Sequence, residues 1–233
     1  TLGVGGVAIR AAIVGSAGGM LPEIRGPAQD SAWGGIGEEE GGTMIAGEKV
    51  FLTGLERANA ETARAWLNDP AVNRFMEVGQ VPITAAAEAA FYDRLETSSS
   101  DFVFEIHLEE NGRYVGNIGL HGVDWRHRFA ELGLFLGSPV DHGRGYAADA
   151  IRTILRFAFD TLGLHRVRLR CYEGNEAGLR LYRHLGFTEV GRHRETFFRD
   201  GRFWDEFHFD MLDHEFRAGD GAVAGAGTGG PTA

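Results

Sequence analysis

The chain has 233 residues, of which 43% are hydrophobic and 24% are charged, a balance typical of a soluble globular domain. Its formal net charge of −10 argues against a general nucleic-acid binder, which needs a basic surface, and no apolar run approaches the length of a transmembrane helix. The only cysteine, Cys171, excludes an internal disulfide and falls in an apolar strand pattern, which favours a buried structural thiol over a nucleophile.

Both ends of the chain differ in composition from its middle. Residues 1–43 are rich in Gly and Ala, end in a run of three glutamates, and lack the layout of a signal peptide. Residues 218–233 are again rich in Gly and Ala. We therefore expect a disordered extension over 1–43, a folded domain over 44–217, a disordered tail over 218–233, and a cytoplasmic protein.

The first half of the domain predicts strands with two helices among them. Phe102, Phe104 and Ile106 alternate with Val103, Glu105 and His107, which is the period of a half-buried strand, and the pair Asn111-Gly112 is typical of a hairpin turn. The expected strands are 50–55, 102–107, 114–125 and 129–136, and the expected helices are 59–67 and 85–96. The first helix should stop at Asn68-Asp69-Pro70.

A glycine-containing turn, PVDHGRGYAADA over Pro139 to Ala150, separates the last of these strands from a long helical pattern. Gly143 and Gly145 allow a tight turn and a close ligand approach, and the free amides at a helix start attract an anion. The same segment also fits an ordinary strand-to-helix turn. It lacks the Lys-Ser/Thr of a P-loop, and Ala148 replaces the third glycine of a dinucleotide fingerprint.

The second half of the domain predicts a helix to Leu162, a strand over 166–171, a short helix ended by Gly186, and two final strands over 188–198 and 202–212. A mostly antiparallel first half followed by a strand–helix–strand–helix unit predicts a mixed α/β sheet with helices on both faces.

The glycine turn followed by NEAGLRLYRHLGF over Asn175 to Phe187 resembles the GNAT family of acetyl-CoA-dependent N-acetyltransferases. The segments GEKVFLTGLE, AELGLFLGSPVDHGRGYAADA and RHRETFFRDGRFWDEFHFDML are similar to its branch of ribosomal-protein-alanine and spermidine N-acetyltransferases. The resemblance implies the GNAT fold, in which two central parallel strands splay apart around acetyl-CoA. It also implies transfer of acetyl to a primary amine of a protein N-terminus, a polyamine or another small amine.

The same resemblance implies the coenzyme contacts. Backbone amides at the end of the strand before the turn would contact the thioester and pantetheine, the turn would cradle the pyrophosphate, and Asn175 would bond the pantetheine arm. The implied residues are Phe135, Leu136, His142, Gly143, Arg144, Gly145, Tyr146, Ala147, Ala148 and Asn175. Two positions depart from the family pattern: His142 replaces a usual Gln or Arg, and Gly178 replaces a usual Ser or Ala.

Amide formation from a thioester needs a neutral amine and a donor for the departing thiolate. The family motif assigns the donor role to Tyr182, whose phenol is protonated at neutral pH; the alternative is a tyrosine that fills the helix–sheet interface. Glu131 is the candidate base, against the alternative of a solvated edge glutamate, and His121 is its rival.

The remaining expectations concern partners. The nine histidines show no zinc spacing with one another or with Cys171, so no metal is expected. The partner is an amine-bearing acceptor, with no nucleic acid or membrane, and homo-oligomerisation is left open. A catalytically silent acyl-CoA-binding sensor is the alternative to an enzyme.

Overall fold

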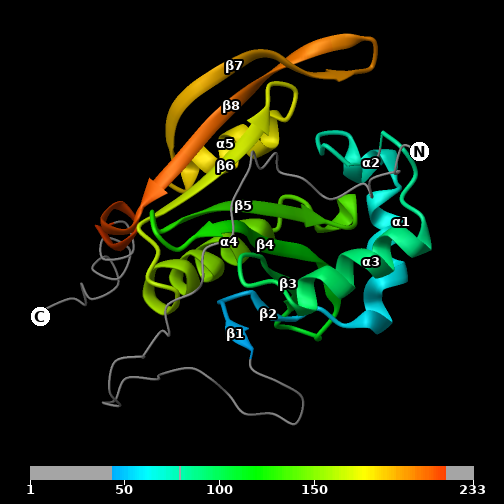
Figure 1. Ribbon diagram of the computed structural model, residues 1–233, viewed down its shortest axis with the longest axis horizontal. Helices are drawn as coiled ribbons and strands as arrows, with labels where there is room; N and C mark the ends of the chain where they lie inside the picture. The colour runs from blue at the N-terminus through cyan, green and yellow to red at the C-terminus, as the bar shows by residue number, and fades with distance from the viewer. Residues whose placement is uncertain (1–43, 79, 219–233) are drawn as a thin grey trace, which may run out of the picture.

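The computed structural model describes residues 44–78 and 80–218, so the predicted extension lies outside the described residues, as does all but the first residue of the predicted tail. The described chain forms one eight-stranded sheet in the order β1-β2-β3-β4-β5-β6-β8-β7 (Figure 1). The strands are β1 Ile45–Ala46, β2 Val50–Gly54, β3 Phe102–Leu108, β4 Tyr114–Asp124, β5 Phe129–Leu136, β6 Arg166–Tyr172, β7 Thr188–Arg199 and β8 Arg202–Leu212.

Helices cover both faces of this sheet. The helices are α1 Ala60–Leu67, α2 Pro70–Asn73, α3 Ala85–Glu96, α4 Tyr146–Arg156 and α5 Glu176–His184, with 3₁₀ turns η1 Arg57–Asn59 and η2 Pro139–Asp141. Helix α4 packs on the strands of the first half, whereas α1, α2 and α3 gather at one end of the sheet and the β7–β8 hairpin extends beside α5 (Figure 1). Within the described residues, no helix is long and apolar enough to cross a bilayer.

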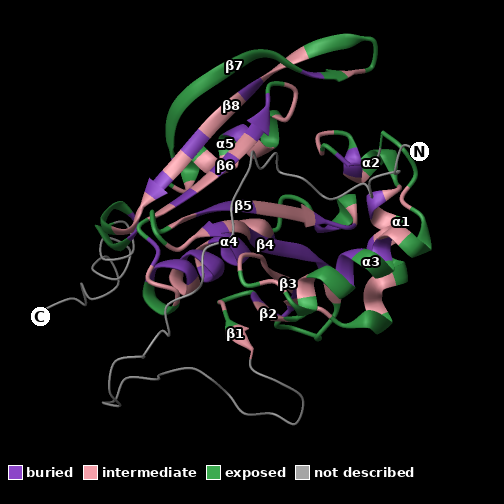
Figure 2. Ribbon diagram, viewed as in Figure 1, coloured by how far each residue is buried: buried purple, intermediate pink, exposed green. Residues whose placement is uncertain are grey.

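The core lies between α4 and one face of the sheet, where the buried segments concentrate (Figure 2). Ile118 and Leu120 of β4 are at most 1% exposed and belong to one cluster with Ile151 and Ile154 of α4. Each such side chain contributes about 1.5–3 kcal/mol by leaving water. Because successive strand residues point to opposite faces, this packing turns the alternate residues of β4 toward the other face, where the site lies.

The predicted splay of the central strands is present. β5 and β6 form the one parallel pair of the described sheet, and they pair only over Phe129–Glu131 and Arg166–Arg168. Beyond that point β5 continues to Leu136 and β6 to Tyr172, with no pairing between them. The two strands therefore open toward the glycine turn.

The structure differs from the sequence prediction at two helix ends. After Arg156 the predicted long helix becomes a π-helical turn, η3 Phe157–Thr161, in which Leu162 N–H donates to the Phe157 carbonyl. Pro70, expected only to stop a helix, begins α2, because Asp69 caps the Ala71 amide and proline tolerates the first helical position.

Candidate active site

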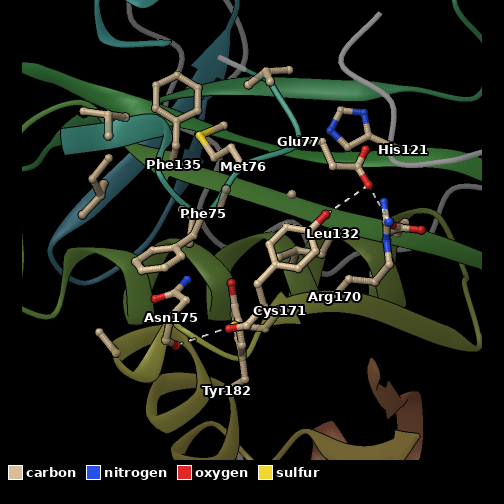
Figure 3. A pocket seen from close by; sticks show the side chains of 18 of the residues that line it. Phe75, Met76, Glu77, His121, Leu132, Phe135, Arg170, Cys171, Asn175 and Tyr182 are labelled. Carbon is tan, nitrogen blue, oxygen red and sulfur yellow. Dashed lines mark hydrogen bonds and ion pairs between the residues drawn. The ribbon is translucent and has the colours of Figure 1, made fainter. Parts of the chain in front are cut away.

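A cavity of about 450 Å³ fills the opening between β5 and β6. Its wall comes from β4, β5, β6, α5, and α2 with the segment that follows it. Figure 3 shows Asn175 and Tyr182 at one end of the cavity and His121 and Arg170 at the other. The segments that meet here are far apart in sequence, so the fold brings the predicted site residues of β5 and α5 together.

The glycine turn directly precedes α4 and ends at its N-cap, Gly145. Gly143 and Gly145 have φ of 72° and 88°, in the left-handed region that favours glycine. The backbone N–H groups of Gly145, Tyr146, Ala147 and Ala148 find no acceptor among the described residues. Four free amides and the helix dipole make this turn fit for a phosphate group.

Two buried carboxylates fix the turn in place. Asp149 Oδ2 accepts from the backbone N–H groups of residues 48, 49 and 50 at 2.7–3.0 Å, which joins the start of β2 to α4. Asp141, 1% exposed, accepts from both terminal nitrogens of Arg113 at 2.6 and 3.0 Å. The amides of the turn are therefore held in position before any ligand binds.

Lys49 is a cation at this turn that the sequence analysis missed. Its Nζ donates to the Arg144 carbonyl at 3.1 Å, and a Cβ added to Gly145 would lie 3.0 Å from the same Nζ. Nothing in the local sequence marks Lys49, because it lies 95 residues before Arg144 and reaches the turn only through the β2–α4 contact.

The open edge of β5 presents one of the two predicted amides. Gly137 N–H donates to the Val115 carbonyl of β4, and successive amides of a strand point to opposite edges. Leu136 N–H therefore points into the opening, whereas Phe135 N–H points toward β4. Both residues line the cavity, as does His142, but only the Leu136 amide is free for a ligand.

Asn175 caps α5 through its side-chain oxygen, which leaves its side-chain NH₂ group available to a ligand. Its Oδ1 accepts from Gly178 N–H at 3.0 Å, and a Cβ on Gly178 would lie 2.7 Å from Asn175 Nδ2. Glycine at 178 thus lets the capping side chain lie close to the backbone. This contact explains a position at which the chain departs from the family pattern.

Tyr182 of α5 lines the cavity beside Cys171. Burial raises the pKa of the Tyr182 hydroxyl above its usual value of 10, so the phenol keeps its proton at neutral pH. Its hydroxyl has no hydrogen-bond partner among the described residues. Cys171 is buried, as predicted, and burial raises the pKa of its thiol to about 12.

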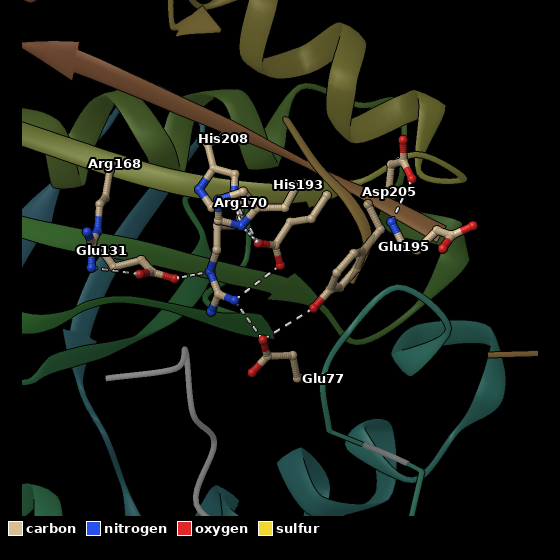
Figure 4. A network of polar contacts seen from close by, with 10 residues as sticks. Glu77, Glu131, Arg168, Arg170, His193, Glu195, Asp205 and His208 are labelled. Atoms are coloured by element: carbon tan, nitrogen blue, oxygen red, sulfur yellow. Dashed lines mark hydrogen bonds and ion pairs between the residues drawn. The ribbon is translucent and has the colours of Figure 1, made fainter. Parts of the chain in front are cut away.

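Glu131 is not the solvated edge glutamate of the alternative interpretation. It is 7% exposed, with Oε1 2.7 Å from Arg170 Nε and Oε2 3.4 Å from Arg168 Nη2. Arg170 also donates to Glu77 at 2.7 Å and to Glu206 at 3.2 Å (Figure 4). Both oxygens of Glu131 are engaged, so a base role would require the release of a guanidinium group.

His121 lines the same cavity and forms a hydrogen-bonded pair with Asp101. His121 Nδ1 lies 3.3 Å from Asp101 Oδ1, and the hydrogen bond from His121 holds the pKa of Asp101 at about 2. Ser98 and Ser100 hydroxyls donate to the other Asp101 oxygen. An ionised Asp101 favours the tautomer that leaves His121 Nε2 as the acceptor, beside the bare backbone of Gly133.

Two smaller cavities continue from the large one toward α3. The nearer, about 80 Å³, shares Met76, His121 and Phe135 with it, and the farther, about 190 Å³, lies under α3. Glu88 of α3 lines both smaller cavities, is 4% exposed, and accepts no hydrogen bond from the described residues. Burial raises the pKa of Glu88 to about 7. A buried carboxylate without a hydrogen-bond partner is costly, and the charge of Arg64, which lowers the pKa of Glu88, offsets only part of this cost.

A phosphate cradle at a helix start, beside an opening between splayed parallel strands, defines an acyl-CoA-dependent transferase. Residues 49–188 match the family model described as an acetyltransferase (GNAT) domain, and the chain belongs to this family. It is an acetyl-CoA-dependent N-acetyltransferase, as the resemblance implied.

Relatives over most of the chain support this assignment. An uncharacterized N-acetyltransferase p20 of Bacillus licheniformis is 25% identical over 72% of this chain and 96% of its own length. Spermidine N(1)-acetyltransferase of Escherichia coli K12 is 26% identical over 75% and 92%. The crystal structure of a Vibrio cholerae spermidine N-acetyltransferase with CoA and spermine shares the fold with a TM-score of 0.67, at 23% identity over 72% of this chain and 98% of that one.

Proposed function

We propose that the acceptor of this N-acetyltransferase is a small aliphatic amine that carries a second cationic group. The observation that carries the proposal is Glu88, a buried carboxylate without a hydrogen-bond partner among the described residues, at the end of an apolar cavity that continues from the acetyl-transfer opening. The relatives named as spermidine acetyltransferases support the same class of acceptor.

The size of the inner cavity favours a thin chain over a ring. Benzene occupies engineered apolar cavities of about 150 Å³, roughly twice the 80 Å³ beside Glu88. An alkyl chain can pass His121 and leave a primary amine near the Leu136 amide, while its distal ammonium pairs with Glu88. An N-terminal peptide would have to place a backbone in the same apolar space.

The coenzyme lies along the opening in this proposal. The amides from Gly145 to Ala148 bind the pyrophosphate, with Lys49 and Arg144 as cations beside them. Leu136 N–H and Asn175 Nδ2 bind the pantetheine arm and the thioester carbonyl. Backbone donors fixed before binding stabilise the developing oxyanion without reorganisation.

His121, supported by Asp101, is the base that we propose for the acceptor amine. Its Nε2 is free on the cavity side, whereas Glu131 has both oxygens bound by arginines. Glu131 then positions Arg170 in the wall of the opening. The neutral amine attacks the thioester carbonyl, the C–S bond breaks, and the sulfur leaves as thiolate. Tyr182 donates its hydroxyl proton or a hydrogen bond to that thiolate.

A paired-substrate assay tests the acceptor. Purified protein is given acetyl-CoA with an aliphatic diamine, the monoamine of equal chain length, or a short peptide with a free N-terminus, and thiol release is followed. We expect the diamine to give the highest kcat/KM. Glu88→Gln should raise KM for the diamine by at least about tenfold, the usual scale for a lost charged partner, and should leave the monoamine unaffected.

Glu110→Gln, at an exposed position, serves as the matched control and should change KM for neither the diamine nor the monoamine. Equal KM effects on the diamine and the monoamine would refute recognition at Glu88. A preference for the peptide would refute the small-amine acceptor. Coenzyme binding without thiol release from any amine would favour the alternative of a catalytically silent acyl-CoA-binding sensor.

A further inference from the structure

Two histidines and a glutamate converge on the β7–β8 hairpin, outside the acetyl-transfer cavity. His193 of β7 lies opposite Glu206 of β8, and His208 lies two residues beyond Glu206. Opposed residues share a face of the sheet, as do residues two apart on one strand. The three side chains are therefore on one face, and Figure 4 shows His193 and His208 next to each other.

Their ligand atoms are spaced like those around one metal ion. His208 Nε2 lies 3.0 Å from His193 Nδ1 and 2.9 Å from Glu206 Oε1, and His193 Nδ1 lies 3.8 Å from Glu206 Oε1. Tetrahedral ligands about 2.1 Å from Zn²⁺ are about 3.4 Å apart, within the observed range. Among residues 44–78 and 80–218, no other trio of His, Cys, Asp and Glu brings its ligand atoms this close.

The charges around the trio favour a cation. The connected network contains three carboxylates, Glu77, Glu131 and Glu206, but only two guanidinium groups, those of Arg168 and Arg170. Glu206 is 2% exposed, so its charge is poorly screened by water.

The second oxygen of Glu206 is held away from the trio. Oε2 accepts from Arg170 Nη1 at 3.2 Å, which turns Oε1 toward the histidines. A hydrogen-bonded partner behind a metal ligand fixes its orientation in this way. The strand register shifts directly after His193, so a bound ion would join β7 to β8 where their ladder is interrupted.

We propose that His193, Glu206 and His208 bind a divalent transition-metal ion of the zinc class, with water at the remaining position. Two imidazoles and one carboxylate suit Zn²⁺, Co²⁺ and Ni²⁺, and the site is separate from the acetyl-transfer residues. Spacing along the chain did not reveal the trio, because the hairpin joins histidines 15 residues apart. The ion's role is to fasten the hairpin, so acetyl transfer does not pass through it.

Metal titration of the untagged, chelator-treated full chain tests the proposal. Zn²⁺ is titrated by calorimetry, and Co²⁺ is added in parallel to record the absorption bands of its coordination sphere. We expect one equivalent to bind, Co²⁺ bands with nitrogen ligation, and a higher melting temperature with Zn²⁺ because the ion binds only the folded chain.

Each of two variants should weaken Zn²⁺ binding by at least about tenfold, the lower end of losses seen even for residues behind a ligand. His193→Gln changes a side chain that is 67% exposed and so preserves the fold; His208→Gln is the second. His214→Gln is the matched control, a histidine beside Asp213 that belongs to no such trio and should bind as the parent does. Absence of a one-equivalent site in the parent, unchanged affinity in both variants, or an equal loss in the control would overturn the proposal.

Discussion

Replacing the buried Glu88 by Gln should stabilise the protein at alkaline pH. Glu88 is 4% exposed, and burial raises its pKa from 4.5 to about 7. Between these two values the folded state binds more protons than the unfolded state, so the free energy of unfolding falls as the pH rises through this window. At about 1.4 kcal/mol for each pKa unit, the ionised carboxylate costs roughly 3 kcal/mol above pH 7.

The neutral Gln has nearly the same volume and does not titrate, so the Gln variant should lose about 2.5 kcal/mol less than the parent between pH 5 and pH 8. Arg64 lowers and Glu61 raises the pKa of Glu88, and neither changes charge in that window. Histidines titrate there, but equally in both proteins.

Urea unfolding at pH 5, 6, 7 and 8 measures the difference directly, and Glu110→Gln is the exposed control that should follow the parent. Parallel stability profiles for parent and Glu88→Gln would refute the reasoning, since they would mean that Glu88 titrates alike in the folded and unfolded chain. The same variant should lose affinity for a diamine, so stability and acceptor binding should move in opposite directions.

Four further outcomes are expected. Tyr182→Phe should lower kcat by about 10²–10⁴-fold with the dissociation constant of acetyl-CoA unchanged, because a donor to the leaving thiolate acts in the transition state. Near-parental turnover would mean that Tyr182 only packs against its neighbours. Gly145→Val should abolish acetyl-CoA binding in calorimetry, because Gly145 has a φ of 88° and a Cβ there would lie 3.0 Å from Lys49 Nζ. Gly163→Val is the control, since Gly163 has a φ of 65° in an open turn, and this variant should bind acetyl-CoA normally. A chain of residues 44–218 should keep its melting temperature and activity. Phe216→Ala should lower the free energy of unfolding by about 3 kcal/mol, because Phe216 is 7% exposed and its ring lies 5.5 Å from the Phe159 ring.

The fold could be predicted from sequence because its signals are local. Alternation in β3, the hairpin turn before β4 and the glycines before α4 each report on a few neighbouring residues, and α3 begins and ends where periodicity placed it. The π-helical turn after Arg156 could not be predicted, because the same apolar spacing fits an α-helix and the change depends on packing in three dimensions.

The side-chain partners of the site could not be predicted for a related reason. Lys49 reaches the glycine turn across 95 residues, and Glu131 meets Arg170 only because β5 and β6 run side by side. His121 looked isolated in the sequence, yet Asp101, the residue just before β3, supports it. Spacing within a segment carries no information about such pairs.

The two halves of the site therefore differ in how they can change with sequence. The proposed coenzyme side consists mainly of backbone amides, at the helix start and at the open edge of β5, and backbone groups tolerate exchanges such as those at His142 and Gly178. The proposed acceptor side consists of side chains, with Glu88 on α3 and His121 on β4 at its centre. One substitution at Glu88 removes a charge and alters a cavity of 80 Å³, without touching the coenzyme. A fold that binds acetyl-CoA through its backbone can thus change its acceptor through α3 and the segment before it.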